Sequence, residues 1–103
     1  MKFYIKHSMT GRLRVHMDMK HMSFKQADIL EYYIKNIETV TSVKVYEKTC
    51  DAVIEFKGDK AQIINELKHR TYSQMAVPED VLNSSGREMN SYYQDKLVNK
   101  VFL

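Results

Sequence analysis

The sequence predicts a single α+β domain in which an antiparallel sheet carries two helices on one face. Three observations support this prediction. The chain has 103 residues, the length of one domain; its first twenty residues alternate between apolar and polar; and two later stretches repeat their apolar residues at helical spacing. The composition is 44% hydrophobic and 28% charged, with only three glycines and one proline, which is typical of a folded globular protein.

The opening segment, residues 1–20, is predicted to be one strand in two halves. Apolar residues fall on its odd positions and charged residues on its even ones, the pattern of a half-buried strand. A single strand of this length is unusual, and Gly11 permits a bend or bulge, so we expect a hinge near Ser8–Gly11. The odd, apolar face includes His7, Met9, Met17 and Met19.

A helix is predicted to begin at Phe24 and to run to about Asn36. Ser23 and Gln26 have the spacing of a capping box, in which each side chain satisfies a free backbone N–H at the helix start. Apolar residues then recur at helical spacing, so one face of this helix is expected to lie on the sheet.

Two strands are predicted over residues 43–46 and 52–56, joined as a hairpin by the turn Glu47–Asp51. A second helix follows, with Asp59 as its cap and a basic end at residues 68–70 that suits the negative end of the helix dipole. A short run at residues 72–77, stopped by Pro78, is either a fourth strand or a covering loop. With the strand, the order is βαββαβ, that of a ferredoxin-like sandwich over residues 1–78.

The tail, residues 79–103, differs in character from the domain before it. Asn83–Gly86 has the composition of a turn or linker. Beyond it, apolar residues at helical spacing among lysines predict an amphipathic helix over Arg87–Phe102.

Cysteine content and hydropathy narrow the functional classes. A single cysteine, Cys50, excludes an internal disulfide and a CxxC metal or redox pair, and it fits a reducing cytosol. No stretch approaches the roughly 18–20 apolar residues that span a bilayer, so we expect the isolated segment to be soluble. We find no catalytic arrangement in the sequence, and we expect no enzymatic activity from this segment alone.

Three segments resemble heavy-metal-associated domains: His7–Val15, Thr41–Tyr46 and Ala52–Phe56. More narrowly, the chain is similar to the divergent, cysteine-poor variety at the N-terminus of bacterial metal-pumping P-type ATPases, in which a Gly-Arg-Leu-Arg-Val strand stands where better-known relatives carry their metal loop. The tail over Tyr92–Lys100 resembles the segment that leads into the first membrane helix of such pumps.

The resemblance implies a regulatory or docking domain at the cytoplasmic face of the cell membrane. Its parent protein would be an ATP-hydrolysing pump for a transition-metal cation. Its partners would be the other cytosolic domains of that pump and, through the tail, the membrane surface.

The resemblance also implies that the usual metal site is lost. Met9 and Thr10 can be laid on the start of the family motif Met-Thr-Cys-x-x-Cys, but Gly11 and Arg14 then stand in place of both cysteines. Cu(I) or Zn(II) bound in the familiar way needs those thiolates. The remaining soft donors are His16, His21 and Met22, with His7 and Met9 nearby. The competing interpretation is that the methionines pack in the core and Met22 acts as a helix staple.

A basic stripe on the opening strand is the candidate interaction face. It consists of Lys2, Lys6, Arg12 and Arg14, with Tyr4 among them. Such a stripe is also typical of a merely solvated face, or of an RNA-binding sheet, but residues 52–56 lack the interleaved aromatics and glycines of the latter. Nucleic acid is therefore not the expected partner. The alternative to a pump domain is a free-standing module, either a metallochaperone-like binder of soft metals or a basic nucleic-acid-binding domain.

Overall fold

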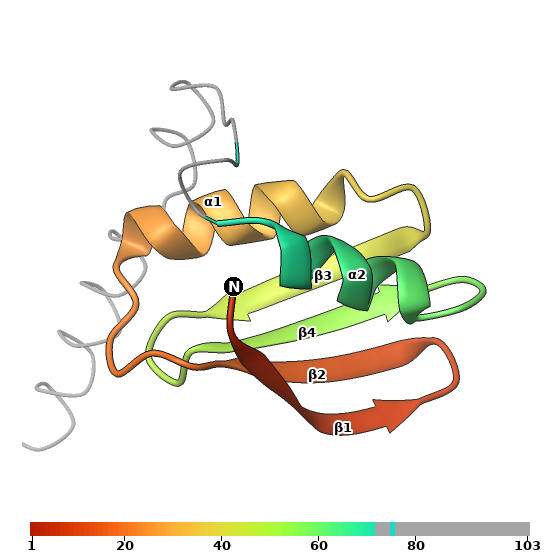
Figure 1. Ribbon diagram of the computed structural model, residues 1–103, viewed down its shortest axis with the longest axis horizontal. Helices are drawn as coiled ribbons and strands as arrows, with labels where there is room; N and C mark the ends of the chain where they lie inside the picture. Colours follow the sequence, from red (N-terminus) through yellow and green to blue (C-terminus); the bar gives the residue numbers. More distant parts are fainter. Residues whose placement is uncertain (72–74, 76–103) are drawn as a thin grey trace, which may run out of the picture.

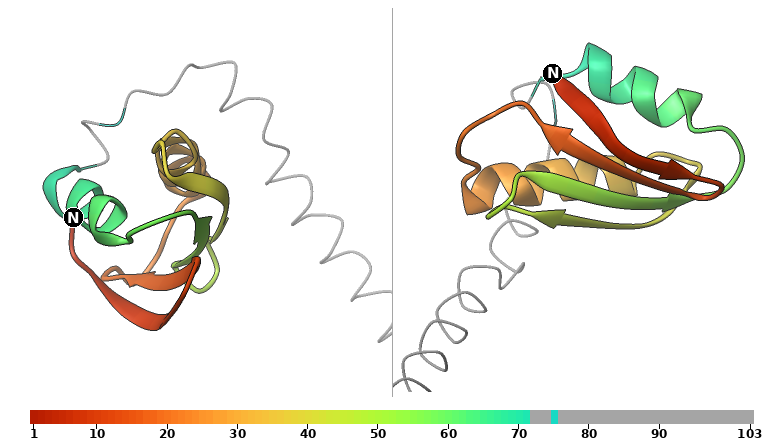
Figure 2. Two further views of the ribbon diagram at one scale, coloured as in Figure 1. Left: turned by 90° about the vertical axis from the view of Figure 1, so that its right-hand side faces the viewer. Right: turned by 90° about the horizontal axis from the view of Figure 1, so that it is seen from below.

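The computed structural model describes residues 1–71 and Met75. These residues form a four-stranded antiparallel sheet with two helices on one face (Figures 1 and 2). The elements in chain order are β1 (Phe3–Met9), β2 (Arg12–Met17), α1 (Phe24–Lys35), β3 (Val40–Tyr46), β4 (Asp51–Phe56) and α2 (Ala61–His69). The predicted α+β class is confirmed. Within the described part of the chain, no helix is long and apolar enough to cross a membrane.

The opening segment is two strands, and the prediction of one strand hinged near Ser8–Gly11 is wrong. β1 and β2 pair antiparallel from Phe3 opposite Met17 to Met9 opposite Arg12, so the chain reverses fully at Thr10 and Gly11. Gly11 has φ +77°, a left-handed conformation that glycine adopts readily, and a Cβ at this position would lie 3.4 Å from the Phe56 carbonyl oxygen.

A β-bulge at Lys6 explains why the alternation looked continuous. The register shift between Ile5 and His7 moves the inward-facing positions of β1 from odd to even numbers. The two-residue turn at Thr10 and Gly11 then moves them back to odd numbers in β2. Odd residues therefore point inward at the start of β1 and along β2, but not between. His7 and Met9 lie on the outward face, opposite Arg14 and Arg12, and their predicted place on the apolar face is wrong.

The strand order in the sheet is β1-β2-β4-β3, with β2 and β4 in the centre (Figure 1). From β2 to α2 the element order is the predicted βαββα, and β1 is an additional strand at the edge beside β2. This arrangement is compatible with a ferredoxin-like fold. The expected fourth strand over residues 72–77 lies outside the described residues except for Met75, and the expected linker and helix over 79–103 lie wholly outside them.

Both predicted helices form, and the predicted capping residues lie at or next to their first turns. Ser23 Oγ accepts from the Gln26 backbone N–H, and the Gln26 side chain accepts from the Ser23 N–H, each at 3.0 Å. This confirms the capping box at the start of α1. The N-cap position of α2 is Lys60 and not the predicted Asp59. Asp59 lies one residue earlier, and its Oδ1 accepts from the N–H of Ala61, the first residue of α2, at 3.0 Å.

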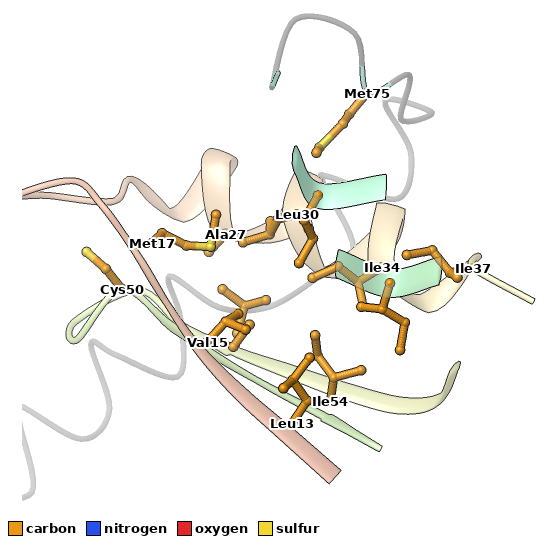
Figure 3. Close-up of a cluster of buried hydrophobic side chains, with 14 of the residues drawn as sticks. Leu13, Val15, Met17, Ala27, Leu30, Ile34, Ile37, Cys50, Ile54 and Met75 are labelled. Carbon is orange, nitrogen blue, oxygen red and sulfur yellow. The ribbon is translucent and has the colours of Figure 1, made fainter. Parts of the chain in front are cut away.

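The core lies between the inner face of the sheet and the two helices (Figure 3). Leu13 and Val15 from β2 and Ile54 from β4 are fully buried under Leu30 and Ile34 of α1. Met75 is also buried and lies on the helix side of this cluster. On the other side of the domain, the Met1 ammonium donates to the carbonyl oxygens of Leu67, Lys68 and Arg70, which ties the start of β1 to the end of α2.

Candidate functional site

The sheet face that points away from the helices carries most of the polar residues singled out in the sequence. The view along the sheet shows α1 and α2 on one side only (Figure 2). Cross-strand pairing places on this open face the side chains of Tyr4, His7, Met9, Arg12, Arg14, His16, Ser42, Lys44, Tyr46, Asp51, Val53 and Glu55. The bulge residue Lys6 joins them through its contact with Asp51.

Asp51, the first residue of β4, lies at one end of this face and binds several of its charged side chains. Its carboxylate is fully buried and accepts hydrogen bonds from side chains of the first hairpin, both from β1 and from β2. Lys6 Nζ lies 3.0 Å and Arg14 Nη2 2.9 Å from Asp51 Oδ2, while His16 Nδ1 lies 2.7 Å from Oδ1. Arg14 Nε adds a longer contact of 3.3 Å to Oδ2. We call these four residues the Asp51 cluster.

The Asp51 carboxylate is ionised at neutral pH. Burial alone would raise the pKa of this carboxyl, but the hydrogen bonds from His16, Lys6 and Arg14 outweigh burial and lower the pKa to about 2. An ionised carboxylate only accepts hydrogen bonds, so His16 Nδ1 carries a hydrogen and donates a hydrogen bond to Asp51 Oδ1. The Nε2 atom of His16 is therefore the ring nitrogen left for any other partner.

Acid is expected to remove the stability that this carboxylate provides. Because the pKa of Asp51 is lowered from its ordinary 3.8 to about 2 in the folded state, the unfolded state binds more protons between these values. The stabilisation is complete above pH 3.8 and is lost as the pH falls towards 2, a change of roughly 2 kcal/mol. Urea unfolding at a series of pH values measures it. An Asp51→Asn variant should lack this loss. If the free energy of unfolding of the variant fell as much from pH 4 to pH 2 as that of the unaltered protein, the assignment would be contradicted.

Two tyrosines flank the Asp51 cluster at the same end of the sheet. Tyr4, opposite His16, is 56% exposed, and the two rings lie 4.9 Å apart between centroids. Tyr46, opposite Asp51, is 42% exposed, and the Lys44 Nζ lies 5.8 Å from the centre of its ring. The open face thus combines positive charge with two half-exposed aromatic rings.

The structure divides the predicted metal ligands among three places. His16, His7 and Met9 lie on the open face. Met22 is buried in the core on the opposite side of the sheet, as expected for a packing residue. His21 is exposed in the loop before α1, in a pocket shared with Phe24 and Lys48. Among the residues that the structure describes, no group of three or more His, Cys, Asp or Glu side chains is placed to hold a metal ion.

Three of the four residues of the predicted basic stripe stay together in the structure. Lys6, Arg12 and Arg14 all lie on the open face, and two of them contact Asp51 directly. Lys2 precedes β1 and lines a pocket with Ile64 and Lys68, near α2.

Cys50 closes the β3–β4 turn and is buried. It has φ +59°, and its Sγ lies 3.8 Å from the Glu47 carbonyl oxygen. Burial, and then the negative charge of Asp51, raise the pKa of the Cys50 thiol. A buried thiol with a raised pKa is a poor nucleophile.

Cys50 is therefore expected to react slowly with a thiol reagent such as DTNB. At pH 8 the folded protein should react at least about 100-fold more slowly than the same protein in urea, because the thiolate is the reactive form and is both rare and shielded. Absorbance at the released thiolate's wavelength gives both rates. Similar rates with and without urea would show that the turn opens readily.

Sequence analysis missed Asp51 as a site residue and counted it only as the end of a turn. One signal was present: Asp51 is the lone carboxylate at the start of the apolar stretch Ala52–Phe56. Its importance depends on register, since its partners Lys6, Arg14 and His16 are 45, 37 and 35 residues away.

Comparison with protein-family models, with curated proteins and with solved structures found no match. Function is therefore inferred from the residues of the chain itself.

Proposed function

We propose that this chain is a docking domain that binds a protein partner through the open face of its sheet. In its parent protein it would position or regulate a metal-cation-transporting P-type ATPase at the cytoplasmic face of the membrane. The observation that carries the docking role is the Asp51 cluster, a set of cationic groups held in place on a sheet face that neither α1 nor α2 covers.

The order of the strands and helices supports the proposal that the parent protein is such a pump. The run from β2 to α2 has the order of a ferredoxin-like domain, and we propose that β1 takes the edge position beside β2 that the last strand of such a domain would fill. The segment Gly11–Val15, which resembles the Gly-Arg-Leu-Arg-Val strand of the cysteine-poor pump domains, forms the end of the first turn and most of β2.

Docking fits the residues better than metal delivery does. The soft donors of the sequence are separated by the sheet, with Met22 in the core and His16 on the open face. His16 is also surrounded by the cations Lys6 and Arg14, which share its carboxylate partner and disfavour a metal cation nearby.

A metal titration tests this preference. Reduced protein would be titrated with Cu(I), Zn(II) and Fe(II) against competing chelators, while NMR follows the His and Met side chains. We expect no saturable binding at micromolar concentration. Saturable binding that shifts His16, His21 and Met22 together would contradict the docking role and favour a metallochaperone-like module.

The gene tests the parent protein directly. Downstream of the codon for Leu103 we expect hydrophobic spans and an Asp-Lys-Thr-Gly-Thr phosphorylation motif. A stop codon there would favour the free-standing module. With the pump sequence in hand, its separate cytosolic domains can be added to the labelled 103-residue protein, and amide shifts confined to the outward residues of β1, β2 and β4 would support docking through this face.

A further inference from the structure

We infer that the open face recognises carboxylates, and that its partner is an acidic protein segment rich in Asp or Glu. This inference rests on the proposed docking function and names the chemistry of the partner. Three observations support it: the Asp51 cluster has hydrogen-bond donors that Asp51 does not use, positive charge surrounds the cluster on the open face, and the two tyrosine rings nearby already contact other side chains.

The Asp51 cluster has more hydrogen-bond donors than its own carboxylate uses. Arg14 has five N–H donors and directs only Nε and Nη2 at Asp51, while Lys6 has three and directs one. Asp51 already accepts four contacts, three of them at Oδ2. The side chains of Lys6 and Arg14 are 41% and 44% exposed, so their remaining donors can reach a second carboxylate from outside.

Positive charge extends from the Asp51 cluster across the whole sheet. Arg14, Val53 and Lys44 are consecutive partners across β2, β4 and β3, and His7 is the β1 member of this row. The bulge residue Lys6 precedes His7, and its ammonium lies beside the Arg14 end of the row because both cations bind Asp51. The open face holds four Lys and Arg side chains against two carboxylates, and one of those carboxylates is buried. A segment with several carboxylates can therefore cross the strands and meet a cation at each end of this row.

Asp51 also prepares the site for binding. Lys6 and Arg14 are long side chains that would otherwise lose rotamer freedom when they bind a ligand. Because Asp51 already holds both, part of this cost is met on folding, and a weakly structured acidic segment can be bound more favourably.

The aromatic rings favour an acidic protein segment over single-stranded nucleic acid. Binding of single strands relies on ring faces that stack on successive bases. Here the Tyr4 ring packs against the His16 ring, and the Lys44 ammonium lies over the Tyr46 ring, so both rings already have a neighbour where a base would stack. Both tyrosines are on the edge strands, and the central strands β2 and β4 present no Phe, Tyr or Trp on this face. The tyrosines instead offer apolar rims for side chains between the carboxylates.

The test uses the full 103-residue protein and three defined probes. These are a capped hexaglutamate peptide, a capped hexaglutamine peptide and a six-residue deoxythymidine oligonucleotide, each titrated at about 50 mM salt so that screening is modest. We expect hexaglutamate to bind and to shift amides of β1, β2 and β4 at outward positions, and we expect hexaglutamine to shift none. Tighter binding of the oligonucleotide would overturn the acidic partner in favour of nucleic acid.

Matched variants separate a built site from general charge attraction. The double variant Lys6→Met and Arg14→Met should weaken hexaglutamate binding by about tenfold or more. Lys25→Met with Lys35→Met removes the same charge from exposed positions of α1 and should change the affinity by less than about twofold. Equal losses in both double variants would overturn the site.

A further variant covers the case in which removing two of the three side-chain partners of Asp51 unfolds the protein. Lys44 is on the same row, and in the described part of the chain no hydrogen bond or ion pair joins it to Asp51. Lys44→Gln should therefore weaken hexaglutamate binding about threefold with the fold intact. An unchanged affinity would overturn the proposed row. Failure of hexaglutamate to bind would overturn the carboxylate site alone, because docking to the pump domains is measured separately.

Discussion

Replacing Ile54 by alanine is expected to lower the free energy of unfolding by about 3–4 kcal/mol. Ile54 is fully buried in the centre of β4, where it faces the helices between Leu13 on β2 and Val43 on β3. Truncation leaves a cavity in a core that one layer of helices covers. Folded domains have a total stability of only about 5–15 kcal/mol, so this single change removes a large part of it.

Val53→Ala is the matched control on the next position of the same strand. Its side chain is half-buried on the open face, so the same kind of truncation should cost less than about 1 kcal/mol. Urea unfolding followed by far-UV circular dichroism measures both variants. A larger loss for Val53→Ala than for Ile54→Ala would mean that the two faces of β4 are assigned the wrong way round.

Asp51→Asn is expected to cost about 2–3 kcal/mol of stability at pH 7. The substitution keeps the size of the side chain but leaves Lys6 and Arg14 close together without the carboxylate between them. It also replaces one acceptor oxygen by an amide group that would point donors at donors. The loss falls short of that for a fully buried ion pair because both cations are partly exposed and can turn towards water.

Glu55→Gln provides the comparison for Asp51→Asn. Glu55 is on the same strand and the same face, but it is exposed, and losing its charge should change the stability by less than about 0.5 kcal/mol. The two variants differ only in burial and partners, so equal effects in urea unfolding would show that the Asp51 cluster contributes nothing of its own.

The local parts of the fold could be predicted because neighbouring residues determine them. The capping pair Ser23 and Gln26 places the start of α1, and the short apolar stretch Ala52–Phe56 places β4 to within one residue. The turn at Thr10 and Gly11 was harder, since the bulge at Lys6 restores the odd-even pattern that a hairpin would otherwise break. Periodicity alone could not separate a bent strand from two paired strands.

The candidate site could be predicted only in part for a different reason. The basic residues of β1 and β2 were visible as a stripe, but their meaning depends on which residue of β4 lies beside them. Register places Asp51 opposite His16 and next to the row of Arg14, and nothing in the local sequence fixes that pairing. The soft donors were grouped by closeness in the chain, and the sheet separates them.

The strand order also has a consequence for how the chain folds. β1 with β2 and β3 with β4 are hairpins whose turns are short, whereas all of α1 and β3 separate β2 from β4 in the chain. Closing short loops costs little entropy, so we expect both hairpins to form early and the pairing of β2 with β4 to come later. Asp51 arrives from one hairpin and its three partners from the other. The cationic face is thus assembled only in the step that joins the two halves of the sheet, and hydrogen exchange at β2 and β4 would report on its formation.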